Sequence, residues 1–341
     1  MSTTSSQTPL TPERIMQMAW GYAPPLAIEA AIHLGVFDGL DGHAKSAEQI
    51  AAETRCSLRG ITALLNLQVG LGLLEKTAGG SYHLTPESRT FLISSKPSFQ
   101  GGLFRHMSNQ LIPKWLELTK VVQTGKPVST VNDPSDGSEF FMKFVEDIFP
   151  MSYPSARLLA EHLGTDNAST PITVLDLAAG SGVWGIALSQ KSPNVRVRAV
   201  DWPRVLEVTR RVVERFGLSD RYSFAAGDLS DADFGAGHQI ATLGHILHSE
   251  GETRSRALLR KTFKALAPGG TIAIAEFLVN KDRTAPAGSL IFALNMLVNT
   301  ADGSTYSFEE IKDWLEEAGF TQARLLPSPG PSPLILANRP K

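Results

Sequence analysis

The feature that most restricts the fold of this chain is the stretch ITVLDLAAGSGVWG, residues 172–185. It contains Gly180, Gly182 and Gly185 in the spacing G-x-G-x-x-G, after an apolar run typical of a buried strand and before an apolar run typical of a helix. A strand, a tight glycine turn and a helix in this order predict the nucleotide-binding loop of an open α/β sheet. The glycine spacing alone leaves open whether the ligand is NAD or another adenosine compound.

Strand-like and helix-like segments alternate after this loop. The strand-like runs are ITVLDL, VRVRAVD, RYSFAAGD, HQIATLGHIL and TIAIAEFLV, and helices are expected at about 183–191, 203–216 and 252–267. Such alternation predicts βαβ units and a mostly parallel sheet. Two further strand-like runs, ARLLP and PLILANR, are joined by the short SPGPSP, a connection that only an antiparallel pair can use. The expected class is therefore α/β.

Composition divides the chain into four regions. We expect a disordered polar tail, a helical region, an aromatic-rich helical linker and the α/β region, at 1–10, 11–104, 105–165 and 166–341. With 19% charged residues and a net charge of -2, the chain lacks the electrostatic footprint of a nucleic-acid binder. The first residues, MSTTSSQTPL, do not have the segments of a signal peptide, and the apolar GSLIFALNMLV is too short to span a bilayer.

The single cysteine, Cys56, rules out a disulfide framework and a cysteine-based metal site. It fits a reducing compartment, so we expect a soluble, cytoplasmic protein that binds neither nucleic acid nor membrane.

The helical region outlines a winged helix. Ser46 is a good N-cap and Glu48 lies in the first turn of one helix, a second helix follows, and the Gly-Gly turn of TAGGSYHLTPES separates two short strands. A winged helix can bind DNA, but this candidate recognition helix carries Arg59 and no other base-reading cation until Lys76. The region is therefore interpreted as an interaction or dimerisation module.

Three acids mark the carboxyl ends of successive predicted strands. An open α/β sheet binds its ligand at these ends. Asp201 is placed to accept from both hydroxyls of a ribose, and Asp228 from an exocyclic amine such as that of adenine. Asp176, four residues before Gly180, would repel a pyrophosphate but attract an ammonium or sulfonium charge. This set favours S-adenosylmethionine over NAD.

The motifs LDLAAGSG, AVDWP, AGDL, ILH, LAPGGTIAIAE and EEAGF, in this order, resemble those of class I S-adenosylmethionine-dependent O-methyltransferases of small molecules. The subgroup is the one with an N-terminal winged-helix dimerisation domain, known from plant phenolic and bacterial secondary-metabolite enzymes. The resemblance covers residues from about 12 to 339. It implies a Rossmann-like seven-stranded sheet with its last strand antiparallel, a homodimer formed through the N-terminal domain, and a small-molecule acceptor. The positions expected to hold the cofactor are Asp176, Gly180, Ser181, Gly182, Asp201, Trp202, Asp228 and Leu229.

The resemblance also assigns the catalytic groups. His248, in LGHILHSEGE, matches the family's general base, and Glu276, at the end of TIAIAEF, matches the acid that orients it. Histidine suits this role because its unperturbed pKa lies near neutrality. His245 lies three residues before His248, and on a strand this spacing would put the two on opposite faces, so that only one would face the methyl group.

The chain departs from the family at several positions. The family has Asp-Trp after the base, where this chain has Ser249-Glu250 followed by Gly251. No acid lies at 305–308, where many relatives have a second acid near the histidine, and Gly244 stands where plant members have a lysine. These changes leave open methylation of carbon or nitrogen, or a reaction without methyl transfer.

The acceptor pocket is expected to be mainly apolar with a few amides, which fits an aromatic or polycyclic alcohol. The candidates are Met151, Phe104, His106, Trp115, Phe144, Asn295, Met296 and Asn299. No metal is implied, because metal-assisted methyltransferases need a cluster of oxygen ligands. Two alternatives remain: a dinucleotide-dependent oxidoreductase, and a winged-helix regulator that senses S-adenosylmethionine.

Overall fold

The computed structural model describes the chain over residues 10–131, 134–142, 144–167, 170–330 and 332–341. Nearly all of the tail that the sequence predicts to be disordered therefore lies outside the described residues. The chain divides into two compact units, Met1–Asn109 and Gln110–Lys341. No helix in the described ranges is long and apolar enough to cross a bilayer.

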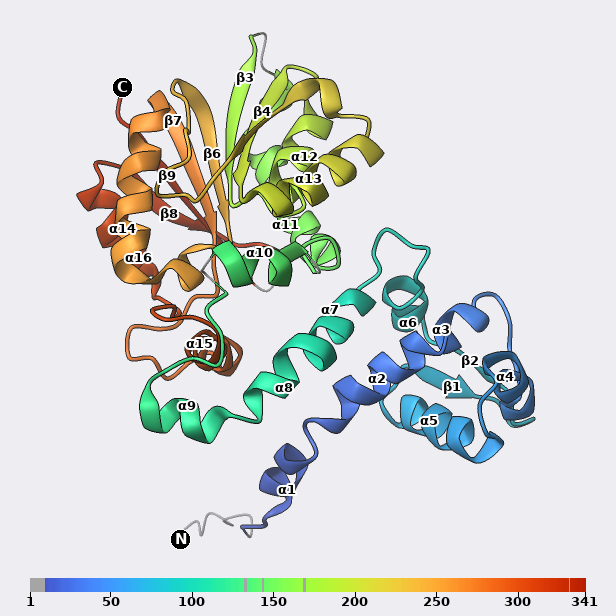
Figure 1. The fold of residues 1–341 in the computed structure, drawn as a ribbon. Coiled ribbons are helices and arrows are strands. Elements are labelled where there is room, and N and C mark those ends of the chain that lie inside the picture. The colour runs from blue at the N-terminus through green and yellow to red at the C-terminus, as the bar shows by residue number, and fades with distance from the viewer. Residues whose placement is uncertain (1–9, 132–133, 143, 168–169, 331) are drawn as a thin grey trace, which may run out of the picture. The chain divides into compact units, whose positions relative to one another are not determined.

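The N-terminal unit consists of short helices and one small sheet. Its elements are α1 (Glu13–Ala19), α2 (Ala23–His33), α3 (Val36–Gly39), α4 (Ala47–Thr54), α5 (Leu58–Gly70), β1 (Leu74–Lys76), β2 (Tyr82–Leu84), α6 (Pro86–Phe91), α7 (Gly101–His106) and a π-helical turn (Met107–Leu111). Strands β1 and β2 pair antiparallel, so the order α4, α5, β1, β2 is that of a winged helix (Figure 1). The predicted cap is confirmed, because Ser46 and Gln49 form a reciprocal capping box at the start of α4.

The second unit is built on one seven-stranded sheet. Its strands are β3 (Ile172–Leu177), β4 (Val195–Asp201), β5 (Tyr222–Ala226), β6 (His238–Gly244), β7 (Leu266–Ala275), β8 (Thr321–Leu326) and β9 (Leu334–Asn338). They lie in the order β5-β4-β3-β6-β7-β9-β8, and β9 runs antiparallel to both of its neighbours. The predicted α/β class, with an antiparallel last strand, is confirmed.

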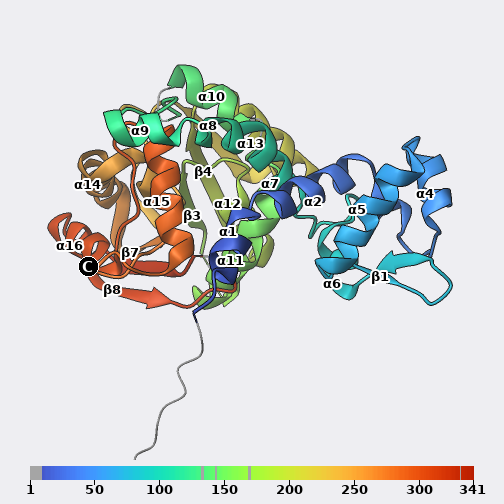
Figure 2. The ribbon, with the colours of Figure 1, turned by 90° about the horizontal axis from the view of Figure 1, so that it is seen from below.

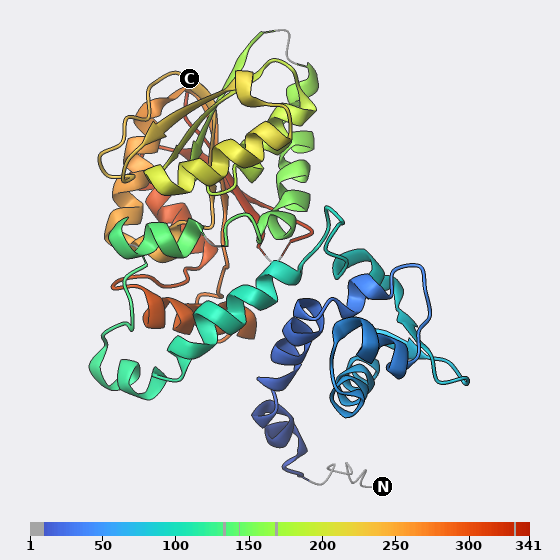
Figure 3. The same cartoon turned by 45° about the vertical axis from the view of Figure 1, so that its right-hand side comes forward.

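Helices cover both faces of this sheet. The helices of the unit are α8 (Ile112–Trp115), α9 (Leu118–Thr124), α10 (Pro134–Met142), α11 (Phe149–His162), α12 (Val183–Lys191), α13 (Pro203–Arg215), α14 (Leu247–Ala265), α15 (Ala287–Asn299) and α16 (Phe308–Glu317), with 3-10 turns at Thr165–Asn167 and Ser219–Arg221. Helices α14 and α16 lie on one face, and α12 and α13 on the other (Figures 1 and 2). In Figure 3, the yellow α13 lies in front of the strands.

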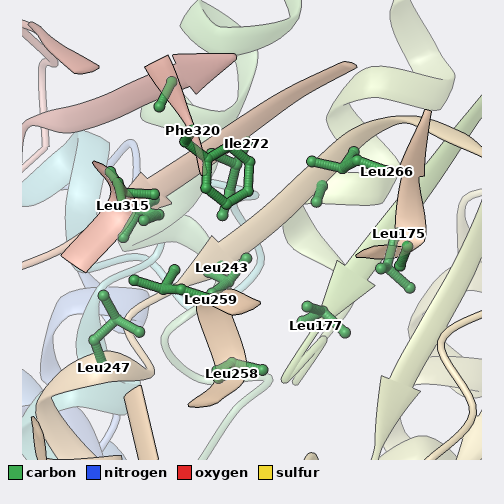
Figure 4. Packing of buried hydrophobic residues seen from close by; sticks show 14 of the residues in the cluster. Leu175, Leu177, Leu243, Leu247, Leu258, Leu259, Leu266, Ile272, Leu315 and Phe320 are labelled. Atoms are coloured by element: carbon green, nitrogen blue, oxygen red, sulfur yellow. The ribbon is translucent and has the colours of Figure 1, made fainter. Parts of the chain in front are cut away.

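Side chains that alternate between the two faces of the sheet fill the two core layers between the strands and the helices. In β7 and β9, Ile272 and Ile335 belong to the core cluster beneath α14 and α16, whereas Ala273 and Leu334 belong to the cluster beneath α11, α12 and α13. Figure 4 shows the first cluster, in which Ile272 lies among leucines of the strands and of α14. Each fully buried leucine or isoleucine contributes roughly 1.5–3 kcal/mol, so this packing fixes the strand ends that carry the polar residues.

The region around the predicted histidines differs from its prediction. Strand β6 ends at Gly244, and His245 has a left-handed φ of 61° that turns the chain out of the sheet. His248 lies in the first turn of α14, which is interrupted at Gly251 (φ 73°, ψ 168°). The prediction that His245 and His248 lie on opposite faces of a strand is therefore wrong. The helix expected at about 252–267 corresponds to the part of α14 after this break.

Candidate active site

The glycine loop lies where the strand order reverses. Strand β3 has β4 on one side and β6 on the other, and this is the place where open α/β sheets bind ligands. Gly182, with a φ of 77°, is the N-cap of α12, and the first N–H groups of the helix have no partner within it. A Cβ at Gly185 would lie 2.6 Å from the Tyr222 hydroxyl and 2.9 Å from Val197. The third glycine therefore lets α12 pack closely on the sheet.

Asp201 is positioned beside this loop. Its Oδ2 accepts a hydrogen bond from the Gly180 N–H at 2.9 Å, and its Oδ1 accepts one from the Trp202 N–H at 2.7 Å. Burial raises the pKa of Asp201 to about 6, although these two bonds lower it. Each carboxylate oxygen retains a second lone pair, so the group can still accept from the hydroxyls of a sugar.

Asp176 lies behind the loop and is fully buried. Its Oδ1 accepts from the Thr242 hydroxyl at 2.7 Å, and its Oδ2 accepts from the Gly185 N–H at 3.2 Å. Burial raises the pKa of Asp176 to about 7, against the effect of these hydrogen bonds. The carboxyl group thus ties β3 to β6 and to the first turn of α12. Its direct contact with the cofactor stays a prediction.

Asp228 lies two residues after β5, next to Leu229. Its Oδ1 accepts from the Ser230 N–H and from Arg254, both at 2.9 Å, and its Oδ2 accepts from the Trp202 indole N–H at 3.4 Å. Burial raises the pKa of Asp228, but Ser230 and Arg254 outweigh it and hold the pKa below its usual value. The carboxylate therefore stays ionised and is an acceptor only. Arg254 was not predicted from the sequence.

His248 and Glu276 form a buried pair between β6 and β7. The two strands are parallel with Gly244 opposite Ala275, so the residues that follow them come together although they are 28 positions apart. His248 Nδ1 lies 2.8 Å from Glu276 Oε2, and the His248 backbone N–H donates to Glu276 Oε1 at 3.3 Å. Because an ionised carboxylate only accepts, Nδ1 carries the proton and Nε2 has the free lone pair.

The charge of Glu276 is stabilised by its neighbours. Burial alone would raise the pKa of Glu276, but the neighbouring His248 ring and the hydrogen bonds from His248 lower it below the ordinary value. The ring of His248 is contacted edge-on by Phe292 at 4.8 Å between centroids, and the Phe277 ring lies 4.3 Å from that of Phe292 with the two planes tilted by 40°. The imidazole therefore lies against aromatic side chains on one side and a carboxylate on the other.

His245 has a different environment. Its Nε2 lies 2.8 Å from the Ser332 hydroxyl, and its ring centroid is 6.5 Å from that of His248. Desolvation lowers the pKa of His245 to about 4, so the ring is neutral at physiological pH. It borders the pair without being hydrogen-bonded to it.

A tryptophan fills the space beside Gly244. A Cβ at Gly244 would lie 1.9 Å from Trp184 Nε1, so any larger residue there would displace the indole. Trp184 belongs to the first turn of α12 and is buried. Gly244, which stands where plant members have a lysine, thus leaves room for the indole of Trp184. In the sequence, this tryptophan stands within the glycine-loop motif, two positions after Gly182.

Several acceptor-pocket candidates meet at α15. The Trp115 indole donates to Asn295 Oδ1 at 2.9 Å, Asn299 Nδ2 donates to the Asn295 carbonyl at 2.9 Å, and Lys114 donates to Asn299 Oδ1 at 3.0 Å. Met296 is buried on the same helix. Phe292, which contacts His248, lies one turn before Asn295, so the helix connects this polar network to the His248–Glu276 pair.

The remaining candidates lie elsewhere. Phe104 packs against the core of the N-terminal unit, to which His106 also belongs. Phe144 packs against Phe140 and Phe141, and Met151 lies in the first turn of α11. Their contribution to an acceptor pocket stays a prediction. Within the described part of the chain, no group of three or more His, Cys, Asp or Glu side chains is arranged to hold a metal ion.

Known proteins share this architecture. Residues 155–321 match the O-methyltransferase domain, and residues 16–94 match the O-methyltransferase dimerisation domain. The chain is 30% identical to the 3-hydroxy-5-methyl-1-naphthoate 3-O-methyltransferase of Streptomyces sahachiroi, covering 95% of this chain and 94% of the relative. It is 28% identical to the tetracenomycin polyketide synthesis 8-O-methyl transferase TcmO of Streptomyces glaucescens, covering 97% of each.

Solved structures agree with the sequence relatives. PigF, solved with S-adenosylhomocysteine, superposes with a TM-score of 0.79 at 26% identity, covering 96% of this chain and 100% of that one. Human N-acetylserotonin methyltransferase in complex with S-adenosylmethionine has the same fold, with a TM-score of 0.85 at 23% identity, covering 99% and 100%. The chain therefore belongs to the S-adenosylmethionine-dependent O-methyltransferases that carry an N-terminal dimerisation domain.

Proposed function

We propose that this enzyme methylates a hydroxyl group of a small aromatic or polyketide-like metabolite, with His248 as the general base. The observation that carries the proposal is the buried His248–Glu276 pair, whose geometry leaves Nε2 as the ring nitrogen available to an acceptor. S-adenosylmethionine supplies an activated methyl group, so the protein has to align the acceptor and remove its proton. Alignment is worth roughly 7–11 kcal/mol where the geometry is near attack.

In this mechanism Glu276 stays ionised and holds the Nδ1–H of His248. The lone pair on Nε2 takes the proton of the acceptor hydroxyl as its oxygen becomes nucleophilic. The ring is then an imidazolium, whose charge the carboxylate at 2.8 Å stabilises. His245 is neutral and does not compete for this proton.

The residues of the glycine loop fit an adenosine compound with a charged amino acid group. Gly180 and Gly182 both have a positive φ and bring the backbone close to a ligand without a Cβ between them. Asp201 would accept from the ribose hydroxyls, and Asp228 from the adenine amine. Both acids lie beside Trp202, whose backbone and indole they bind.

The proposed acceptor class follows from the side chains around the base. Phe277, Phe292 and Met296 offer an apolar surface, and Trp115 and Asn295 add a polar edge. Two relatives are named for a naphthoate and for a tetracenomycin polyketide, which are of this chemical kind. A flat, partly hydroxylated ring system matches such a lining.

We also propose a homodimer formed through the N-terminal unit. The matched dimerisation domain supports it, and so does α1, on which no residue is buried, with Ile15 and Met18 exposed on the helix and Trp20 exposed directly after it. An exposed apolar helix of this kind marks a contact surface. Light scattering on wild type and on a Trp20→Asp variant tests this, since the wild type should have twice the mass of the chain and the variant should be shifted toward the single chain.

The activity itself is tested with a labelled methyl donor and a panel of phenols, naphthols, flavonoids and polyketides, together with aromatic amines. Label should appear on hydroxylated rings, and blocking the hydroxyl as its methyl ether should abolish it. Transfer to amines alone would overturn the proposal.

A further inference from the structure

One ion-pair network near the proposed cofactor site takes no part in the proposed proton transfer. Arg254, on α14, donates from one guanidinium nitrogen to Asp228 at 2.9 and 3.2 Å and from Nε to Glu250 at 2.5 Å. Glu250 is buried, with 6% of its surface exposed. It stands two residues after the general base, where the family carries tryptophan. The chain has thus replaced an apolar ring by a buried acid that is paired with arginine.

A second cation on the same helix holds the same loop. Lys261 lies seven residues after Arg254, two turns along α14, and therefore on the same helix face. Its ammonium group donates to the carbonyls of Leu229, Ser230 and Ala232 at 2.9, 2.9 and 2.7 Å. The segment that carries Asp228 is thus fixed to α14 at two points.

We propose that Arg254, held by Glu250, is a positioning residue that fixes the Asp228 carboxylate for recognition of the adenine amine. This rests on the proposed role of Asp228 as the acceptor for that amine. With Arg254 on one side, Trp202 on another and Ser230 in its own turn, the carboxylate cannot rotate freely. The buried Glu250 in turn restrains the guanidinium, which is otherwise partly exposed.

The chemistry predicts a specific readout. A fixed carboxylate accepts from the amine of adenine but repels the carbonyl oxygen that replaces this amine in hypoxanthine. The wild type should therefore bind S-adenosylhomocysteine more tightly than S-inosylhomocysteine. Loss of Arg254 frees the carboxylate, so this preference should fall, whereas a change that only loosened the fold would weaken both ligands alike.

The experiment measures both dissociation constants by calorimetry. Arg254→Ala should weaken S-adenosylhomocysteine about tenfold, the factor that corresponds to about 1.4 kcal/mol, and leave the inosyl compound nearly unchanged. Arg254→Lys should recover part of the preference. The matched control is Arg256→Ala, because Arg256 lies on the same helix and pairs with two acids, Glu252 and Glu317, that are not part of the loop. It should alter neither constant.

The outcomes distinguish the positioning role of Arg254 from the assignment of Asp228 as the acceptor for the adenine amine. If Asp228→Asn lowers the preference but Arg254→Ala does not, or if Arg254→Ala weakens both ligands equally, the inference is overturned and the site assignment stands. If Asp228→Asn leaves the preference unchanged, Asp228 is not the acceptor, and the assignment falls together with the inference. A wild type that binds neither ligand contradicts the proposed function itself.

Discussion

Replacing Asp176 with asparagine should make the stability of the protein less dependent on pH. Burial raises the pKa of this carboxyl from 3.8 to about 7 in the folded state. The folded state therefore holds the proton more tightly than the unfolded state, and the free energy of unfolding falls as the pH rises through this range. Between pH 6 and pH 8 the two pKa values make that loss about 1.4 kcal/mol.

Asparagine removes the titration without removing the hydrogen bonds. Its Oδ1 can accept from the Gly185 N–H while its Nδ2 donates to the Thr242 hydroxyl, which takes the place of the bond that Thr242 now donates. Asp201, whose pKa is raised to about 6, also titrates near this window, but it is present in both proteins and largely cancels in the difference.

The assay is urea unfolding of wild type and Asp176→Asn at pH 6, 7 and 8, followed by tryptophan fluorescence and circular dichroism. The stability difference should shift toward the variant by about 1.4 kcal/mol from pH 6 to pH 8. A difference that stays constant over this range would refute the reasoning, because it would mean that the carboxyl does not titrate between pH 6 and pH 8 in the folded protein.

Three further predictions concern Asp201 beside the glycine loop, Gly244 at the end of β6, and the His248–Glu276 pair. Asp201→Ala should weaken S-adenosylhomocysteine binding by about 1.5–3 kcal/mol, as measured by calorimetry, and an unchanged dissociation constant in a folded variant would mean that the ribose is held elsewhere. Gly244→Ala should force the Trp184 indole to move and cost roughly 1–3 kcal/mol, visible in thermal unfolding and in tryptophan fluorescence; wild-type values in both would contradict the contact. Glu276→Gln should lower the initial rate less than His248→Ala does, and an equal or larger loss would show that the carboxylate does more than orient the ring.

The fold and the position of the site follow from local patterns. The apolar run before the glycines, the regular return of strands and helices, and the short SPGPSP connection are all features of neighbouring residues. They predict Asp201 at the end of its strand, which is confirmed, and Asp228 at the end of the next, where it lies two residues beyond β5; a parallel sheet brings those ends to one edge. The pairing of His248 with Glu276 was implied by family resemblance, and the register of β6 against β7 explains it.

The errors and omissions concern features that local patterns do not encode. The predicted strand runs through His245 because the apolar pattern continues past Gly244, whereas in the structure the left-handed His245 ends it. Local patterns do not reveal the contact of Arg254 with Asp228, which spans 26 positions, or that of Trp184 with Gly244, which spans 60. The complete burial of Asp176 is also not visible in the local pattern, because it depends on β6 and α12 closing over the carboxyl group.

The most direct test of the account is the rate of methyl transfer by His248→Ala with a neutral phenolic acceptor, measured beside its affinity for S-adenosylhomocysteine. The imidazole acts on the acceptor and not on the adenosine, so the dissociation constant should stay close to the wild-type value. The rate should fall by about 10²–10⁴-fold, and by less with a phenol that is already ionised at the assay pH. Near wild-type turnover on the neutral phenol, in a variant that still binds S-adenosylhomocysteine, would contradict the assignment of His248 as the general base.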